Sequence, residues 1–282
     1  MWFGTMHRLA NVGCPVVGSD LGSATWGTGG AYLSGGGYEV GAADSHKEYS
    51  LQWSAASTIP EAQVMQAMRD GVYSKSPRDL FFFHEPLSLD KNVLPKRWAA
   101  PHLLADAGRT GFTRSTGYTL SGFPLNGAAV DVPASFSPTQ PGRNALFIMI
   151  PPGYTLRIAQ GKTGDSAAGM KYKAVLSGIG VQPTVTSLPQ SAPATIDNSM
   201  GAVTGIILFP QGKFTLYGMR AVLYKTGETY PADFGSSWTW LPGMGHSGCR
   251  FTMPPTYMPQ NGVAGGMASY SASLREVGDW LQ

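Results

Sequence analysis

One stretch of this chain, Thr58–Gly71, has the apolar spacing of an amphipathic α-helix, whereas the rest of the sequence is patterned for strands and turns. The apolar residues that recur on one face of this stretch are Val64, Met65, Met68 and Val72. Such spacing places side chains on one stripe of a helix. One convincing helix in 282 residues predicts a mainly β protein whose first part packs around that helix.

The ends of the predicted helix carry residues that commonly begin and end helices. Thr58 and Glu61 match a capping box, in which two side chains satisfy backbone N–H groups of the first turn. Pro60 is tolerated in a first turn, and Gly71 suits the position just beyond the last turn. The sequence therefore predicts a helix over 58–71.

Glycine and proline are frequent, with 37 and 21 residues, and aromatic residues make up 11% of the chain. This combination indicates a folded chain with many turns. Charged residues are only 13%, about half of the usual ~25%. Because soluble monomers cover themselves with charged side chains, the deficit favours a protein that buries surface against other subunits. A monomer coated with serine, threonine and glycine is the alternative.

Short strands are expected in the first part of the chain. Lys47–Trp53 alternates apolar and polar residues, which predicts a half-buried strand directly before the helix. After the helix, Phe81, Phe82 and Phe83 cannot all face the same side of a strand. We expect this run either to be buried on both faces or to present an aromatic side chain at a subunit interface.

Residues 116–282 contain several strand patterns and no helix pattern. The predicted strands are Leu146–Ile150, Tyr154–Ala159, Met170–Leu176, Val203–Phe209, Phe214–Tyr224 and Ala268–Leu274. Pro151–Gly153 and Pro210–Gly212 predict hairpin turns, and Gly178–Ser199 is expected to be a long loop. Strands that follow one another without helices predict a β-sandwich or jelly roll.

The chain is long enough for two domains. We place the boundary at residue 115, so that residues 1–115 form a β-domain with one helix and residues 116–282 form a β-sandwich. Gly108–Tyr118 is the expected linker, because it holds Gly, Ser, Thr and Arg without a run of large apolar residues.

No stretch carries a strong catalytic motif. Ser247 stands in Gly245–Cys249, which nearly matches the Gly-x-Ser-x-Gly elbow of serine hydrolases, but a strand pattern follows where the elbow needs a helix. Gly161–Thr163 matches the end of a phosphate-binding loop, but Leu156 stands where the first glycine belongs. We expect a turn at Ser247, a hairpin tip at Gly161–Thr163, and no catalytic residue.

Metals, cofactors and nucleic acid are not indicated as partners. The five histidines and the sparse carboxylates form no ligand spacing, and the net charge of +3 includes no basic run. No segment reaches the ~18 apolar residues of a membrane-spanning helix. Cys14 and Cys249 lie far apart in sequence, and we expect both to be reduced. The sequence therefore predicts no metal, no cofactor, no nucleic-acid partner and no membrane span.

Trp238 and Trp240 are separated by one residue, so they would share one face of a strand. Two tryptophans on an exposed sheet face can stack on sugar rings. A pair inside a core is the simpler interpretation. Both alternatives stay open at the level of sequence.

Four segments carry a resemblance to a known family: the start Met1–Thr5, the pattern Trp240–Gly243, the strand pattern Cys249–Met253 and the closing segment Ser273–Trp280. They resemble minor tail proteins of long-tailed phages that infect actinobacteria. A β-domain with one helix followed by a β-sandwich is similar to the distal tail proteins of those phages. The resemblance implies a first domain that forms a ring belt around the tail tube and a second, galectin-like or carbohydrate-module-like sandwich.

The resemblance also implies partners and a location. It implies a homo-oligomeric ring, usually of six copies, beside tail-tube, tail-hub and tip proteins. The protein would be assembled in the host cytoplasm and located at the tail tip of the virion. Three functions therefore compete. They are a structural tail-tip protein with Phe81–Phe83 at a subunit interface, a module that binds a host-surface glycan through Trp238 and Trp240, and a serine hydrolase using Ser247.

Overall fold

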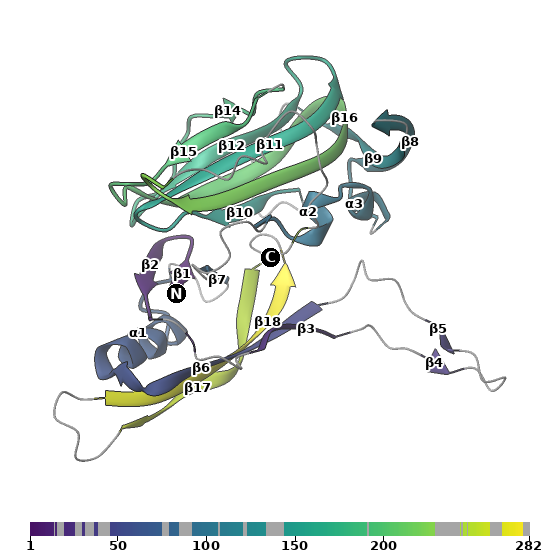
Figure 1. Cartoon of the computed structure of the whole chain (residues 1–282). Coiled ribbons are helices and arrows are strands. Elements are labelled where there is room, and N and C mark those ends of the chain that lie inside the picture. The colour runs from purple at the N-terminus through teal and green to yellow at the C-terminus, as the bar shows by residue number, and fades with distance from the viewer. Residues whose placement is uncertain are drawn as a thin grey trace. The chain divides into compact units, whose positions relative to one another are not determined.

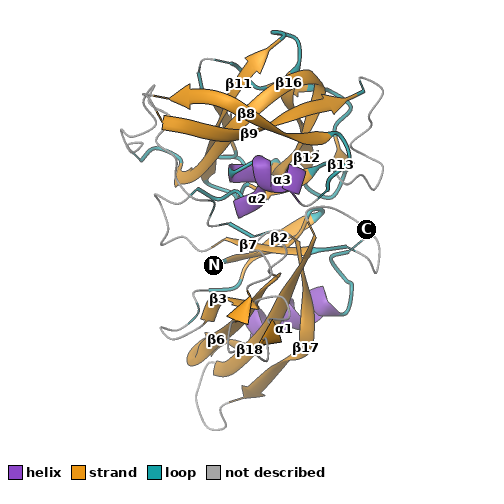
Figure 2. Ribbon diagram, turned by 90° about the vertical axis from the view of Figure 1, so that its right-hand side faces the viewer, coloured by secondary structure: helices purple, strands orange, loops and turns teal. Residues whose placement is uncertain are grey.

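The structure is a computed structural model, drawn in Figure 1 and, turned by 90°, in Figure 2. It describes residues 1–282 apart from 14, 16–19, 26–29, 32–36, 39–45, 75–78, 85–91, 107, 121–122, 134–143, 191, 229–242, 244, 247, 260–266 and 279–282. The described residues form large antiparallel sheets with three helices, so the predicted mainly β fold class is confirmed. The jelly-roll arrangement stays a prediction.

The chain divides into two compact units, and the division differs from the predicted boundary at residue 115. Unit 1 combines Met1–Glu85 with Gly248–Gly278, and unit 2 combines Pro86–Ser247 with Asp279–Gln282. In sequence, the main segment of unit 2 is therefore an insertion between the two segments of unit 1. The prediction of two consecutive domains is wrong, because the last strands of the chain find their hydrogen-bonding partners in the first segment.

The expected linker is also corrected. Most of Gly108–Tyr118 belongs to strand β8 (Phe112–Leu120), which pairs with β9 (Phe123–Val132) inside unit 2. Just before it lie two short helices, α2 (Lys96–Ala99) and α3 (His102–Asp106).

Unit 1 is built on a seven-stranded antiparallel sheet in the order β2-β1-β7-β17-β18-β6-β3. Its strands are β1 (Trp2–Thr5), β2 (Arg8–Asn11), β3 (Asp20–Thr25), β6 (His46–Thr58), β7 (Phe81–His84), β17 (Gly248–Pro259) and β18 (Met267–Gly278). A separate two-stranded ladder joins β4 (Gly30–Ala31) and β5 (Gly37–Tyr38). Because β17 and β18 lie between β7 and β6, both segments of the chain are needed to complete this sheet.

Helix α1 (Ile59–Arg69) confirms the predicted helix and packs against β6, β17 and β18 of unit 1 (Figures 1 and 2). Met65 and Met68 are fully buried, as the apolar stripe predicted. Val72 was placed on the same stripe but is 68% exposed, because the helix ends at Arg69. The buried face of the helix is therefore shorter than the sequence pattern.

Gly71 ends the helix in the way the sequence indicated. It has a φ of 81°, which favours glycine. Its N–H donates to the carbonyl of Met68, and the N–H of Val72 donates to the carbonyl of Ala67. These two hydrogen bonds define a Schellman motif, which satisfies carbonyl groups of the last helical turn.

Alternating strand residues fill the core of unit 1. Large buried side chains of this core include Phe3, Tyr49, Leu51, Trp53, Met65, Met68, Phe81, Tyr270 and Leu274. The ring of Trp53 stacks on that of Tyr270, with centroids 4.4 Å apart. Tyr49, Leu51 and Trp53 are buried while Ser50 and Gln52 are exposed, so the predicted alternation in β6 is confirmed.

Unit 2 is organised around β16 (Val203–Lys225), one continuous strand of 23 residues. Its first half pairs with β10 (Leu146–Met149) and β12 (Gly169–Leu176), and its second half pairs with β9 and β11 (Tyr154–Gly164). The predicted hairpin turn at Pro210–Gly212 is wrong, because these residues lie inside β16 where the pairing partners change.

The hairpin predicted through Pro151–Gly153 is also corrected. The two flanking strands exist, but β10 and β11 pair with different halves of β16 instead of with each other. The remaining strands are β13 (Gly180–Val181), β14 (Thr186–Ser187) and β15 (Ala194–Asp197), which lie in the stretch predicted to be a long loop. Local turn residues thus indicated chain reversals without determining which strands pair.

Candidate functional site

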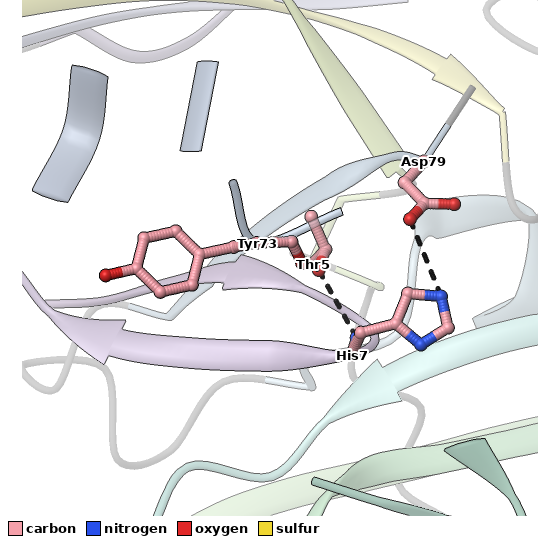
Figure 3. A network of polar contacts seen from close by, with 4 residues as sticks. All are labelled: Thr5, His7, Tyr73 and Asp79. Carbon is pink, nitrogen blue, oxygen red and sulfur yellow. Dashed lines mark hydrogen bonds and ion pairs between the residues drawn. The ribbon is translucent and has the colours of Figure 1, made fainter. Parts of the chain in front are cut away.

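A buried polar cluster among the described residues of unit 1 joins the turn after β1 to the chain before β7 (Figure 3). In the antiparallel register of β1 and β7, Thr5 lies opposite Phe81. His7 lies in the turn between Thr5 and Arg8, and Asp79 lies two residues before Phe81. Nε2 of His7 and Oδ2 of Asp79 lie 3.5 Å apart. The end of the ladder between β1 and β7 therefore brings the imidazole and the carboxylate close together.

Both partners are shielded from solvent. The side chains of His7 and Asp79 are 14% and 2% exposed. Beside them, the guanidinium of Arg8 lies over the ring of Tyr73, 4.6 Å from its centroid. The contact between His7 and Asp79 is an ion pair only when the imidazole is protonated. Its strength therefore depends on the protonation of one side chain.

Thr5 fixes the same turn through the backbone. Its fully buried hydroxyl donates to the carbonyl of Tyr73 over 2.9 Å and accepts a hydrogen bond from the N–H of His7 at 3.3 Å. The hydroxyl is thus engaged with backbone groups on both sides, and the His7 ring is directed at Asp79 (Figure 3). This geometry holds two segments together and does not place the hydroxyl as a nucleophile against the imidazole.

A second polar cluster lies on the surface of unit 2, around the carboxylate of Asp197 at the end of β15. Its Oδ1 accepts hydrogen bonds from the hydroxyls of Thr155 and Thr226, at 2.9 and 3.0 Å. Its Oδ2 accepts one from the hydroxyl of Ser199 at 2.7 Å. The hydrogen bonds from Ser199 and Thr155 lower the pKa of Asp197. The carboxylate ties β15 to β11 and to the end of β16.

A third cluster surrounds Lys162, a buried lysine near the end of β11. Its ammonium donates to the carbonyls of Asp165 at 2.9 Å, Ser166 at 3.5 Å and Ala168. Burial lowers the pKa of Lys162. The ammonium closes the short segment between β11 and β12, which pair with successive parts of β16. The predicted hairpin tip at Gly161–Thr163 is wrong, because these residues lie within β11.

The aromatic run in β7 is part of the core of its own chain. Phe81 and Phe82 are 8% and 4% exposed, and Phe83 is half-buried. The ring of Phe81 stacks on Phe3 at 5.7 Å, and the ring of Phe83 meets Tyr49 edge-on at 4.9 Å. Of the two alternatives left open by the sequence, burial on both faces is observed. Phe81 and Phe82 are therefore corrected from candidate interface residues to core residues.

Several other candidates lie outside the described residues. These are Trp238, Trp240, Ser247 and Cys14, so glycan stacking stays a prediction. The residues that follow Ser247 form strand β17, whereas a nucleophile elbow requires a helix there. Cys249 is fully buried as a thiol in the core of unit 1.

Among the described residues, no three His, Cys, Asp or Glu side chains are grouped so that they could hold a metal ion. None of the helices described is long and apolar enough to cross a membrane. The polar clusters of the described residues connect segments of the fold.

Sequence reasoning missed the three polar clusters. His7 and Asp79 are far apart in sequence, and only the pairing of β1 with β7 brings them together. Lys162 stands between a glycine and a threonine, a setting typical of an exposed lysine.

Comparisons with protein-family models, with curated proteins and with solved structures find no match to this chain.

Proposed function

We propose that this chain is a structural protein that assembles into a ring at the tail tip of a phage virion. The observation that carries the proposal is the sheet of unit 1. Among the described residues, its outermost strands β2 and β3 each pair with one neighbour only. An edge strand exposes N–H and C=O groups that can bond to a strand of another chain. A contact between the β2 edge of one copy and the β3 edge of the next would be head to tail. Such contacts close into a ring when the rotation between copies allows it.

Two further features support this proposal. Charged residues are only 13% of the chain, which suits a protein that buries surface in an assembly. The polar clusters of the described residues engage backbone groups or each other, which suits a protein without enzymatic activity. By its resemblance to distal tail proteins, its partners would be tail-tube, hub and tip proteins. It would be assembled in the host cytoplasm.

The oligomeric state of the purified chain tests the proposal. Native mass spectrometry should find one closed homo-oligomer, with six copies as the number that the resemblance implies. Negative-stain electron microscopy of the same sample should show rings. A stable interface buries more than about 1,000 Å² and should hold copies together in a purified sample. A chain that stays monomeric at tens of micromolar would therefore contradict self-assembly.

Proline substitutions in β3 test whether the sheet edge makes the contact. Ser23 pairs with Glu48 of β6, and Ala24 pairs with Lys47. Because neighbouring strand residues direct their N–H groups to opposite sides, one of Ser23→Pro and Ala24→Pro removes a donor that faces β6 and the other removes a donor that faces away from the sheet. The variant that removes the donor facing away from the sheet should keep the fold, as measured by circular dichroism, and should no longer form the ring. Rings that form in both variants would exclude β3 as the contact.

Fluorophosphonate labelling separates this proposal from a serine hydrolase. We expect Ser247 to stay unlabelled in the native chain, since a strand follows it. Labelling that disappears in Ser247→Ala would favour the hydrolase.

A further inference from the structure

We propose that His7 and Asp79 form a pH-responsive latch that fixes the β1–β2 hairpin to the segment between α1 and β7. The inference stands on the geometry of unit 1 and does not depend on the proposed assembly. Its parts are the 3.5 Å contact between Nε2 of His7 and Oδ2 of Asp79 and the burial of both side chains.

The latch lies where the backbone ladder ends. β1 and β7 pair from Trp2 opposite His84 to Thr5 opposite Phe81. Beyond Thr5 the chain turns back into β2, so the turn relies on other contacts to stay against the neighbouring segment. The hydroxyl of Thr5 supplies one such contact to Tyr73, and the imidazole of His7 supplies another to Asp79.

Only the contact between His7 and Asp79 changes its charge near neutral pH. Imidazole gains or loses its proton in that range, whereas a threonine hydroxyl does not. A protonated ring makes an ion pair with the ionised carboxylate, and a neutral ring makes at most a weaker hydrogen bond. The buried position of Asp79 strengthens the difference, because water screens the pair poorly.

Other charged or titratable groups lie on the segments that adjoin the latch. On the described residues of those segments they are Arg8, Arg69, Asp70, Tyr73, His84 and, on β17, which pairs with β7 at Phe81, Arg250. The guanidinium of Arg8 lies over the ring of Tyr73, and Arg69 is bonded to Asp70. His84 stands at the opposite end of β7, beside Trp2. Lys75 and Arg78 precede Asp79 in sequence, outside the described residues.

The sign of the effect follows from proton linkage. The folded chain places a carboxylate beside the imidazolium, and the unfolded chain does not, so protonation of His7 favours the folded hairpin. The added stability is present at mildly acidic pH and is lost as the pH rises through the range in which imidazole loses its proton.

Hydrogen exchange of the full chain tests the latch. Protection factors, corrected for intrinsic exchange rates, are measured for residues 1–12 at about pH 5.5 and about pH 8. The native chain should show higher protection at the lower pH. His7→Gln keeps a polar side chain that does not titrate, and it should lose most of this difference. Asp79→Asn, which removes the carboxylate, should lose it as well.

His102→Gln is the matched control, because His102 belongs to α3 in unit 2. This variant should keep the pH dependence of residues 1–12. Equal protection at both pH values in the native chain would overturn the latch. So would a pH dependence that persists in His7→Gln, and this result stays decisive even if Asp79→Asn does not fold.

Discussion

Arg275 of β18 donates a hydrogen bond from Nε to Oε1 of Glu48 on β6 over 2.7 Å, although 227 positions separate the two residues. Their side chains are 51% and 38% exposed, so the pair by itself contributes about 0–1 kcal/mol. It marks the register in which the C-terminal strand completes a sheet begun by the N-terminal segment.

Excision of unit 2 should leave a folded unit 1. Cys249 of β17 lies opposite Phe81 of β7, so a short Gly-Ser linker can join His84 to Gly248 in place of the inserted unit. We expect this shortened chain to unfold cooperatively in urea and to give dispersed NMR signals.

The control for the excision is residues 1–115, the domain predicted from sequence. That fragment lacks β17 and β18, which cover α1 and pair with β6 and β7. It should remain unfolded, because those partners supply much of the core. Cooperative folding of residues 1–115 would restore the boundary predicted from sequence.

Met68→Ala should destabilise unit 1 by about 2–5 kcal/mol if the cavity does not collapse. Met68 is fully buried under the sheet. Val72→Ala is the matched control, because Val72 is 68% exposed four residues further on, and it should change the free energy of unfolding by less than about 0.5 kcal/mol. Urea unfolding followed by circular dichroism measures both. Equal effects would mean that the buried face of α1 is misplaced.

Lys162→Met should destabilise unit 2 by about 1–3 kcal/mol, because the buried carbonyl of Ala168 would lose its charged donor. Lys213→Met is the control. The side chain of Lys213 is 80% exposed beside Asp131, and its loss should cost at most about 1 kcal/mol. A cost for Lys162→Met no greater than that of the control would show that the ammonium does not close the segment between β11 and β12.

The same lysine should affect stability at alkaline pH. Burial lowers the pKa of Lys162 below 10.5, so the folded chain holds this proton less tightly than the unfolded chain. Keeping the ammonium charged therefore costs stability at neutral pH, and the cost is relieved as the pH rises toward 10.5. Over that pH range, the Tm of the native chain minus the Tm of Lys162→Met should increase. An unchanged difference would contradict the pKa shift.

Asp197 should contribute to stability at acidic pH with the opposite dependence. Hydrogen bonds from Ser199 and Thr155 hold its pKa below 3.8, so the folded chain keeps the carboxylate ionised more readily than the unfolded chain. This contribution is present above pH 3.8 and is lost as the pH falls through the pKa of the folded state. Thermal unfolding of Asp197→Asn should show a shallower acid decline than the native chain. Asp131→Asn, beside Lys213, serves as an exposed comparison.

Local patterns predicted well those elements that a regular repeat of apolar residues defines, namely the helix and the half-buried strands. The sequence predicts a helix over 58–71, and the structure has α1 over Ile59–Arg69 with Gly71 just beyond its last turn, as the sequence indicates. The half-buried strands around Tyr49 and Tyr270 were found because alternation of apolar and polar residues reports which face is buried.

Turn residues were less informative, because they show where a chain can reverse and not what it pairs with. Pro210–Gly212 has the composition of a hairpin turn but continues β16, whose two halves have different partners. The run Phe81–Phe83 has the composition of an interface but lies in a strand with neighbours on both sides.

The sequence by itself determined the fold class, the helix and the faces that are buried, because these depend on spacings of a few residues. The tertiary structure alone decided that the chain's two outer segments share one sheet and that His7 meets Asp79. Both outcomes depend on hydrogen bonds between strands far apart in sequence. Backbone N–H and C=O groups are the same in every non-proline residue, so the strand patterns themselves do not specify which partner each strand takes.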